Sequence, residues 1–215
     1  MRSVVLFSIA AVVMCACSSE TPRSPTQPES ITLPVTITSA QQAGAPSDHS
    51  VHLSGDQEVF SGSPSPADSR AQGQAIFQIA ADEQSFTYTL MAANIENVVQ
   101  AHIHCGPVGV NGPIVVWLYP DPSASSALVG PTGPHNGVLM AGTVNNTVDP
   151  PATNHVMPTT NPNCPGGVAS LADVLARIRE GNAYVNIHTS DGVPPNNEGP
   201  GDFPGGEVRG QFKGR

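Results

Sequence analysis

The stretch QAIFQIAADEQSFTYTLM, residues 74–91, decides the fold class of this chain. Apolar residues occupy every second position on either side of the pair Asp82-Glu83: Ala75, Phe77, Ile79, Phe86, Tyr88 and Leu90. A period of two residues is typical of a β-strand that lays one face on a hydrophobic core. The stretch therefore predicts a hairpin of two half-buried strands.

The same short, alternating or apolar pattern recurs along the chain, in residues 50–54 continuing into 57–60, 98–104, 113–119, 138–144, 183–189 and 207–212. Turn-forming residues are abundant, with 21 Gly and 22 Pro. One segment, 168–181, instead has helical spacing, with Ser170 and Asp173 placed as a capping box and Gly181 placed to end the helix. We expect an all-β domain, a single antiparallel Greek-key-like β-sandwich or flattened barrel with one short helix near residues 170–180.

The N-terminal residues predict export. Arg2 precedes a short apolar run, residues 4–14, and Ala16 stands directly before Cys17. This layout is typical of a secretory signal, and residues 14–17 resemble a bacterial lipobox with Cys17 as the lipid acceptor. Ser19 supplies no acidic retention signal, so an outer-membrane anchor is favoured over other periplasmic or cell-surface locations. The alternative is an ordinary secreted protein that is cut nearby.

Three segments follow from these patterns. Residues 1–17 form the lipoprotein signal peptide with its lipid-acceptor cysteine, and residues 18–47 form a disordered tether rich in Ser, Thr and Pro. Residues 48–215 form one domain of ordinary size. The domain retains Cys105 and Cys164, and an exported location favours a disulfide between them over free thiols or metal ligation.

The charge balance excludes one class of partner. The chain has 17 acidic and 8 basic residues and a net charge of −9, so nothing supports nucleic-acid binding. No nucleophile elbow, phosphate-binding glycine loop or H-E-x-x-H motif is present. The sequence offers no catalytic residue beyond its histidines, and we expect a protein that is not an enzyme.

Three histidines suggest a metal site. His102 and His104 are two residues apart on a predicted strand and share a face, and His188 occupies the corresponding polar face of 183–189. Imidazole nitrogen suits copper and zinc, and three such ligands leave one position open. The alternative is that these histidines are polar residues on the solvent-exposed side of a sheet. The polar residues expected to surround them are Asn186, Glu207 and Arg209.

Six stretches together resemble the CHRD domain, a module named from chordin and found in many microbial exported proteins. They are HLSGDQEV (52–59), QAIFQIAADEQSFTYTL (74–90), AHIHCGPVGVNGPIVVWLY (101–119), LADVLARIREG (171–181), AYVNIHT (183–189) and PGGEVRGQF (204–212). The resemblance implies a β-rich, sandwich-like domain over residues 52–212. It implies no settled activity, and the use of the module in chordin favours a protein or glycan partner.

A second similarity concerns the order of histidines. HIH at 102–104, GPH at 133–135 and NIHTSDG at 186–192 are similar to the ligand order of copper-zinc superoxide dismutases. That similarity implies copper on His102, His104 and His188, with His135 as a bridging or fourth ligand. It also makes a dismutase-like metalloenzyme the alternative to a metal-binding protein without catalytic activity.

Overall fold

The computed structural model describes residues 47–120, 133–145 and 155–215, and most of this part is β-structure. The strands are β1 Ser47–Ser54, β2 Gln72–Ile79, β3 Ser85–Glu96, β4 Val98–Cys105, β5 Ile114–Tyr119, β6 Pro134–Asn145, β7 Ala183–Thr189 and β8 Val208–Gln211. The predicted signal peptide and nearly all of the predicted tether lie outside the described residues. Within those residues, no helix has the length and hydrophobicity needed to span a bilayer.

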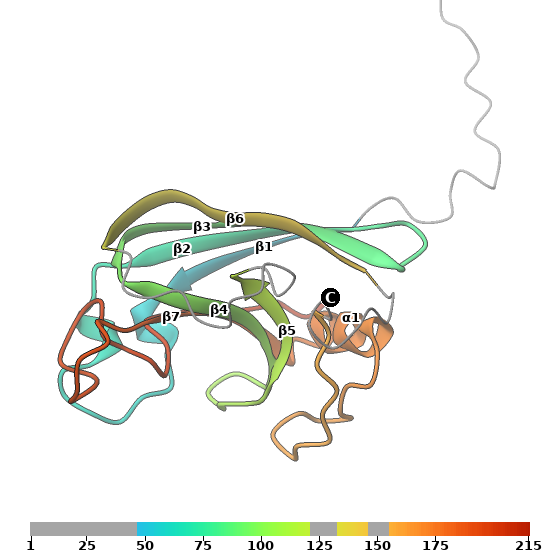
Figure 1. Cartoon of the computed structure of the whole chain (residues 1–215). Helices are drawn as coiled ribbons and strands as arrows, with labels where there is room; N and C mark the ends of the chain where they lie inside the picture. The colour runs from blue at the N-terminus through green and yellow to red at the C-terminus, as the bar shows by residue number, and fades with distance from the viewer. Residues whose placement is uncertain (1–46, 121–132, 146–154) are drawn as a thin grey trace, which may run out of the picture. The chain divides into compact units, whose positions relative to one another are not determined.

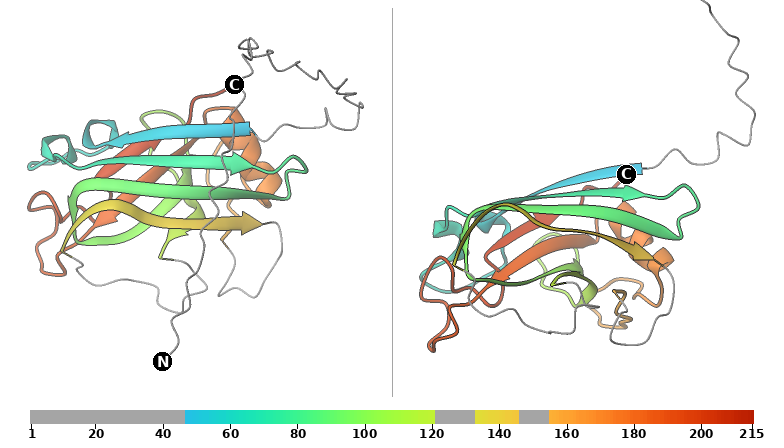
Figure 2. Two further views of the ribbon diagram at one scale, coloured as in Figure 1. Left: turned by 90° about the horizontal axis from the view of Figure 1, so that it is seen from above. Right: turned by 45° about the horizontal axis from the view of Figure 1, so that its top comes forward.

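All eight strands belong to one antiparallel sheet in the order β5-β4-β7-β8-β1-β2-β3-β6. The sheet bends over itself, so that β1, β2, β3 and β6 form one layer and β4, β5 and β7 lie beneath it (Figure 1). The view from above shows the strands of the first layer side by side over the second (Figure 2). The predicted all-β class is confirmed, as a flattened, nearly closed barrel.

The upper layer follows the alternation found in the sequence. Buried and exposed residues alternate strictly along β2, and Phe77 and Phe86 meet across the β2–β3 hairpin with ring centroids 5.8 Å apart. The inward side chains form one core with those of β4, β5, β7 and β8. At roughly 25 cal/mol per Å² of buried apolar surface, this shared core is the main stabilising contribution.

One helix and two short 3₁₀ helices complete the described part: α1 Leu171–Arg179, η2 Gly55–Gln57 and η3 Pro66–Asp68. The predicted capping box of α1 is present, because the Ser170 hydroxyl accepts from the Asp173 amide and the Asp173 carboxylate accepts from the Ser170 amide. The apolar side of α1 joins the core at one end of the barrel (Figure 1). Residues 57–60, predicted as strand, are not; they begin in η2 and continue as irregular chain.

The lower layer departs from the alternation. Every residue of β7 is buried, and so is every residue of β4 except Gln100, which is half-buried. Three loops, residues 55–62, 106–113 and 201–206, contact the face of β4 and β7 that points away from the core, through Glu58, Gly112 and Pro204 respectively. We call this face the covered face. The alternative, in which the three histidines lie on the solvent-exposed side of a sheet, is therefore wrong.

Candidate metal centre

The pairing of β4 with β7 places the three histidines together on the covered face. Across the two strands, Gln100 lies opposite His188, His102 opposite Asn186 and His104 opposite Tyr184. Because side chains two residues apart point the same way, all six project from one face. His188 is therefore a diagonal neighbour of His102.

The three rings converge. Ring centroids are 5.5 Å apart for His102 and His104, 5.0 Å for His102 and His188, and 5.8 Å for His104 and His188. One nitrogen from each ring lies within 4.8 Å of the other two. The separation between His102 Nδ1 and His188 Nε2 is 3.2 Å. Two ligands of one tetrahedral ion at bond lengths of about 2.0–2.1 Å would be about 3.3–3.4 Å apart.

Backbone carbonyls set the tautomers of two rings. His104 Nδ1 lies 2.9 Å from the Gly112 carbonyl oxygen, and His188 Nδ1 lies 2.9 Å from that of Pro204. A carbonyl oxygen only accepts, so each Nδ1 carries the hydrogen and each Nε2 keeps its lone pair. His102 Nδ1 then donates to His188 Nε2. Within the described residues, the buried Nε2 atoms of His102 and His104 have no hydrogen-bond partner.

Burial keeps the three rings neutral. Their exposed fractions are 0% for His102, 9% for His104 and 7% for His188. Loss of hydration lowers the pKa of His102 to about 2, with a smaller effect from the two neighbouring rings. The same cause lowers the pKa of His104 to about 3 and that of His188 to about 4. Neutral imidazole is the form that binds metal ions, so the cluster is ready to ligate at neutral pH.

The family model of the CHRD domain matches residues 49–212, which include every residue of this centre. The chain belongs to the CHRD-domain family. No curated protein and no solved structure matches it.

A stack of side chains supports one side of the centre in this CHRD domain. Tyr184 lies parallel to His104, with ring centroids 4.9 Å apart and an interplanar angle of 9°. The guanidinium carbon of Arg209 lies 3.4 Å from the centre of the Tyr184 ring, within reach of a cation–π interaction. Arg209 also donates to the carbonyls of Pro107 and Val110. Arg209 thereby holds the 106–113 loop, whose Gly112 carbonyl orients His104.

A half-buried carboxyl group stands beside the cluster. Asn186 Nδ2 donates to Glu58 Oε1 at 2.6 Å. Burial raises the pKa of Glu58 to about 8, and the opposing charge of Arg209 offsets only part of that effect. Gly206 allows the 201–206 loop to lie against this pair, since it has φ +130° and a β-carbon there would come within 2.2 Å of Asn186 Nδ2. The raised pKa of Glu58 favours its protonated form near neutral pH.

The other residues predicted for the site have different positions. His135 is not in the cluster; it lies on β6, where its Nε2 is 3.3 Å from the Gly137 carbonyl oxygen. Glu207 does not orient the rings, because its carboxylate accepts from Ser69, Thr189 and the Gly201 amide. The predicted disulfide is confirmed: Cys105 and Cys164 are bonded.

Glu58, Trp117 and the identity of the two orienting carbonyls, those of Gly112 and Pro204, were not predicted from the sequence. Trp117 on β5 packs on the His102 ring, with centroids 4.2 Å apart. The run CGPVGVNGP directly after HIH was the available signal for a turn that folds back over the strand. No local pattern marked Glu58, which comes to the centre only through tertiary structure.

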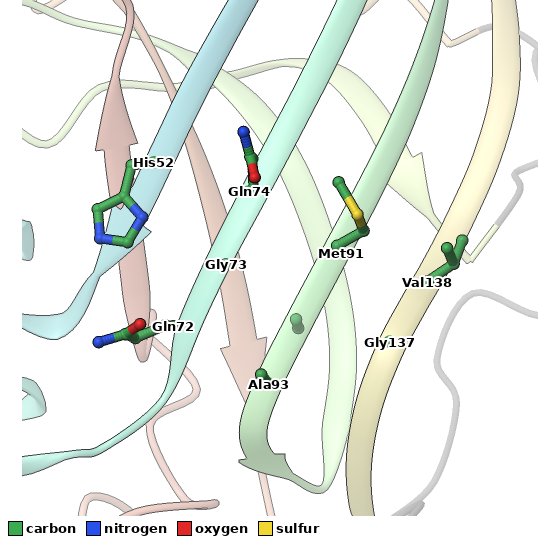
Figure 3. A pocket seen from close by; sticks show the side chains of 9 residues that line it. His52, Gln72, Gly73, Gln74, Met91, Ala93, Gly137 and Val138 are labelled. Atoms are coloured by element: carbon green, nitrogen blue, oxygen red, sulfur yellow. The ribbon is translucent and has the colours of Figure 1, made fainter.

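A separate hollow of about 340 Å³ lies on the outer face of the upper layer, far along the sheet from β4. Figure 3 shows it over small residues of β2, β3 and β6, with His52, Gln74 and Met91 at its borders. Among residues 47–120, 133–145 and 155–215, His102, His104 and His188 are the only group of three potential ligand side chains close enough to share an ion. His52 in the lining of this hollow is exposed and lies outside the histidine cluster. It can therefore serve as a control residue in tests of metal binding.

Proposed function

We propose that this CHRD domain is a membrane-tethered, extracytoplasmic metal-binding protein, with copper as the favoured ion on His102, His104 and His188. One observation carries the proposal. Three buried, neutral rings point nitrogens at one another, and backbone carbonyls fix two of those rings in the tautomer that leaves Nε2 free. A sheet surface that needed only polar residues would not require such an arrangement.

The chemistry of the donors favours copper or zinc. Imidazole nitrogens suit both ions, and copper(II) stands above zinc(II) in the affinity order of the divalent ions. To bind an ion together with His188 Nε2, His102 would either present its unpartnered Nε2 or move its proton from Nδ1 to Nε2 and bind through Nδ1. The backbone carbonyls at His104 and His188 play the part that outer-shell acceptors play in known metal sites, where they set ring orientation.

The first test is the metal content of the purified protein. We expect one copper ion per chain in the wild-type protein by elemental analysis, and none in His104→Gln. Glutamine is chosen because its amide can still donate to the Gly112 carbonyl, which protects the fold. The exposed control His52→Gln should bind like the wild type. Equal copper content in folded His104→Gln would refute the proposal.

The tether is the second part of the proposal. It is supported by Arg2, the apolar run of residues 4–14, and Ala16 before Cys17. Cys17→Ser should move the protein from the membrane fraction to the soluble fraction, with Cys15→Ser as the matched control. Retention of the Cys17→Ser protein in washed membranes would overturn the lipid anchor without affecting the metal centre. A protein or glycan partner stays a prediction.

A further inference from the structure

The donor set of the metal centre carries no negative charge. All three ligands are neutral imidazoles, and the two cysteines of the described residues, Cys105 and Cys164, are joined in a disulfide. The carboxyl group of Glu58 accepts a hydrogen bond from Asn186. Neither Glu58 nor Asn186 belongs to the set of three residues whose ligand atoms are close enough to share an ion. No thiolate or carboxylate of the described residues therefore shares the site with the rings.

A positive charge is already buried beside the cluster. Arg209 is 1% exposed and lies against the Tyr184 ring, whose other neighbour is His104. Its hydrogen-bond partners are neutral: the Asn111 and Gln211 side-chain oxygens and the carbonyls of Pro107 and Val110. Within the described residues, Arg209 forms no salt bridge. Any further cation in this region adds to a charge that has no counter-ion in contact.

The free energy needed to bury an ion grows with the square of its charge, so a divalent ion costs about four times as much as a monovalent ion of the same size. Zinc on three histidines takes a water as its fourth ligand, whereas monovalent copper can be held by two or three nitrogens without one. Trp117 packs directly on His102 and occupies space at the site. Glu58 has a raised pKa, so a compensating carboxylate beside the site would form only by ionising a group whose surroundings favour the protonated form.

We infer that this centre selects monovalent copper over divalent ions. The inference rests on the proposed function, because it names the oxidation state of the ion that the three histidines would hold. The low charge of the ion and the small number of protein ligands both favour the same ion. The preference requires no redox step by the protein, since Cu(I) binds and leaves as Cu(I).

The test measures the affinity of the full-length protein for three ions, Cu(I), Cu(II) and Zn(II). Each ion is offered with a competing chelator of known affinity, and Cu(I) is kept reduced with ascorbate under argon. Ascorbate is used in place of a thiol, which would open the Cys105–Cys164 disulfide. We expect Cu(I) to bind at least about 100-fold more tightly than Cu(II) or Zn(II). His104→Gln should lose the Cu(I) site, and His52→Gln should keep it.

The outcomes separate the two proposals. If no ion binds in a way that depends on His104, the proposed function itself fails. If Cu(II) or Zn(II) binds through His104 as tightly as Cu(I), metal binding stands and the selection of Cu(I) is overturned. Glu58→Gln identifies the cause in that case: a fall in divalent affinity in this variant would show that Glu58 ionises to balance the second charge.

Discussion

The two layers of this barrel share an alternating sequence pattern but differ in the burial of its polar residues. In β2, the polar residues of the alternation face solvent, whereas in β7 the polar residues Tyr184, Asn186 and His188 are buried beneath loops. We call β1, β2, β3 and β6 the open half, and β4, β5, β7 and β8 the covered half. The difference shows that a period of two residues identifies the two faces of a strand but not what lies over the second face.

The covered half depends on hydrogen bonds and the disulfide as well as on its hydrophobic core. Its loops carry backbone carbonyls and a carboxyl group that must all find partners once they are buried. Arg209, Asn186 and the disulfide supply links between these loops and the strands. In the open half, water serves the outward-facing groups. Removing one of these hydrogen bonds or the disulfide should therefore destabilise the covered half more than the open half.

The largest expected effect comes from the disulfide. Cys105 and Cys164 are 59 residues apart, and closing a loop of that length stabilises the fold by about 4 kcal/mol in the chain-entropy model. Replacing both cysteines by Ala should lower the free energy of unfolding by that amount in a urea titration. Hydrogen exchange should accelerate more in β4 than in the β2–β3 hairpin. Equal acceleration of hydrogen exchange in both halves would contradict the conclusion that the covered half depends more on the disulfide.

The second effect concerns the buried guanidinium. Arg209→Met leaves the Pro107 and Val110 carbonyls without their donor, so we expect a loss of about 3 kcal/mol in unfolding free energy. Arg70→Met removes an exposed arginine and should change stability by less than about 0.5 kcal/mol. Similar losses in the two variants would show that the loop contacts of Arg209 contribute little.

The smallest expected effect is the change in stability of the metal-free wild-type protein with pH. The lowered pKa values of His102, His104 and His188 mean that the unfolded chain takes up protons first as pH falls below about 6.5, which destabilises the fold. Between pH 7.5 and 5.5 the three rings together cost about 4 kcal/mol. The raised pKa of Glu58 acts in the opposite direction, because the folded state binds that proton as pH falls from about 8 towards 4.5, which offsets about 2.5 kcal/mol.

The wild-type protein should therefore lose about 1.5 kcal/mol of unfolding free energy between those pH values. Glu58→Gln removes the offset, and its loss over the same interval should approach about 4 kcal/mol. Urea titrations of the apo protein at pH 7.5 and 5.5 measure both. A flat profile in Glu58→Gln would mean that the three rings are solvated and protonate freely.

Much of this protein follows from its sequence alone. Alternation at 74–91 produces the hairpin of β2 and β3, and the Ser170–Asp173 spacing produces the capped helix. The placement of His102 and His104 on one face follows from the strand period. These features are local, because backbone geometry relates residues a few positions apart.

Only the tertiary structure decided what surrounds the histidines. The Glu58–Asn186 hydrogen bond joins residues 128 positions apart, and His102 and His188 meet across 86 positions. Burial of the covered face depends on where three loops come to lie, and those positions depend on contacts between distant segments. The pKa values of the rings follow from that burial, since loss of hydration and not the residue type lowers them. The strand pattern therefore determined which side chains share a face, and tertiary packing decided that this face is a buried, neutral histidine cluster.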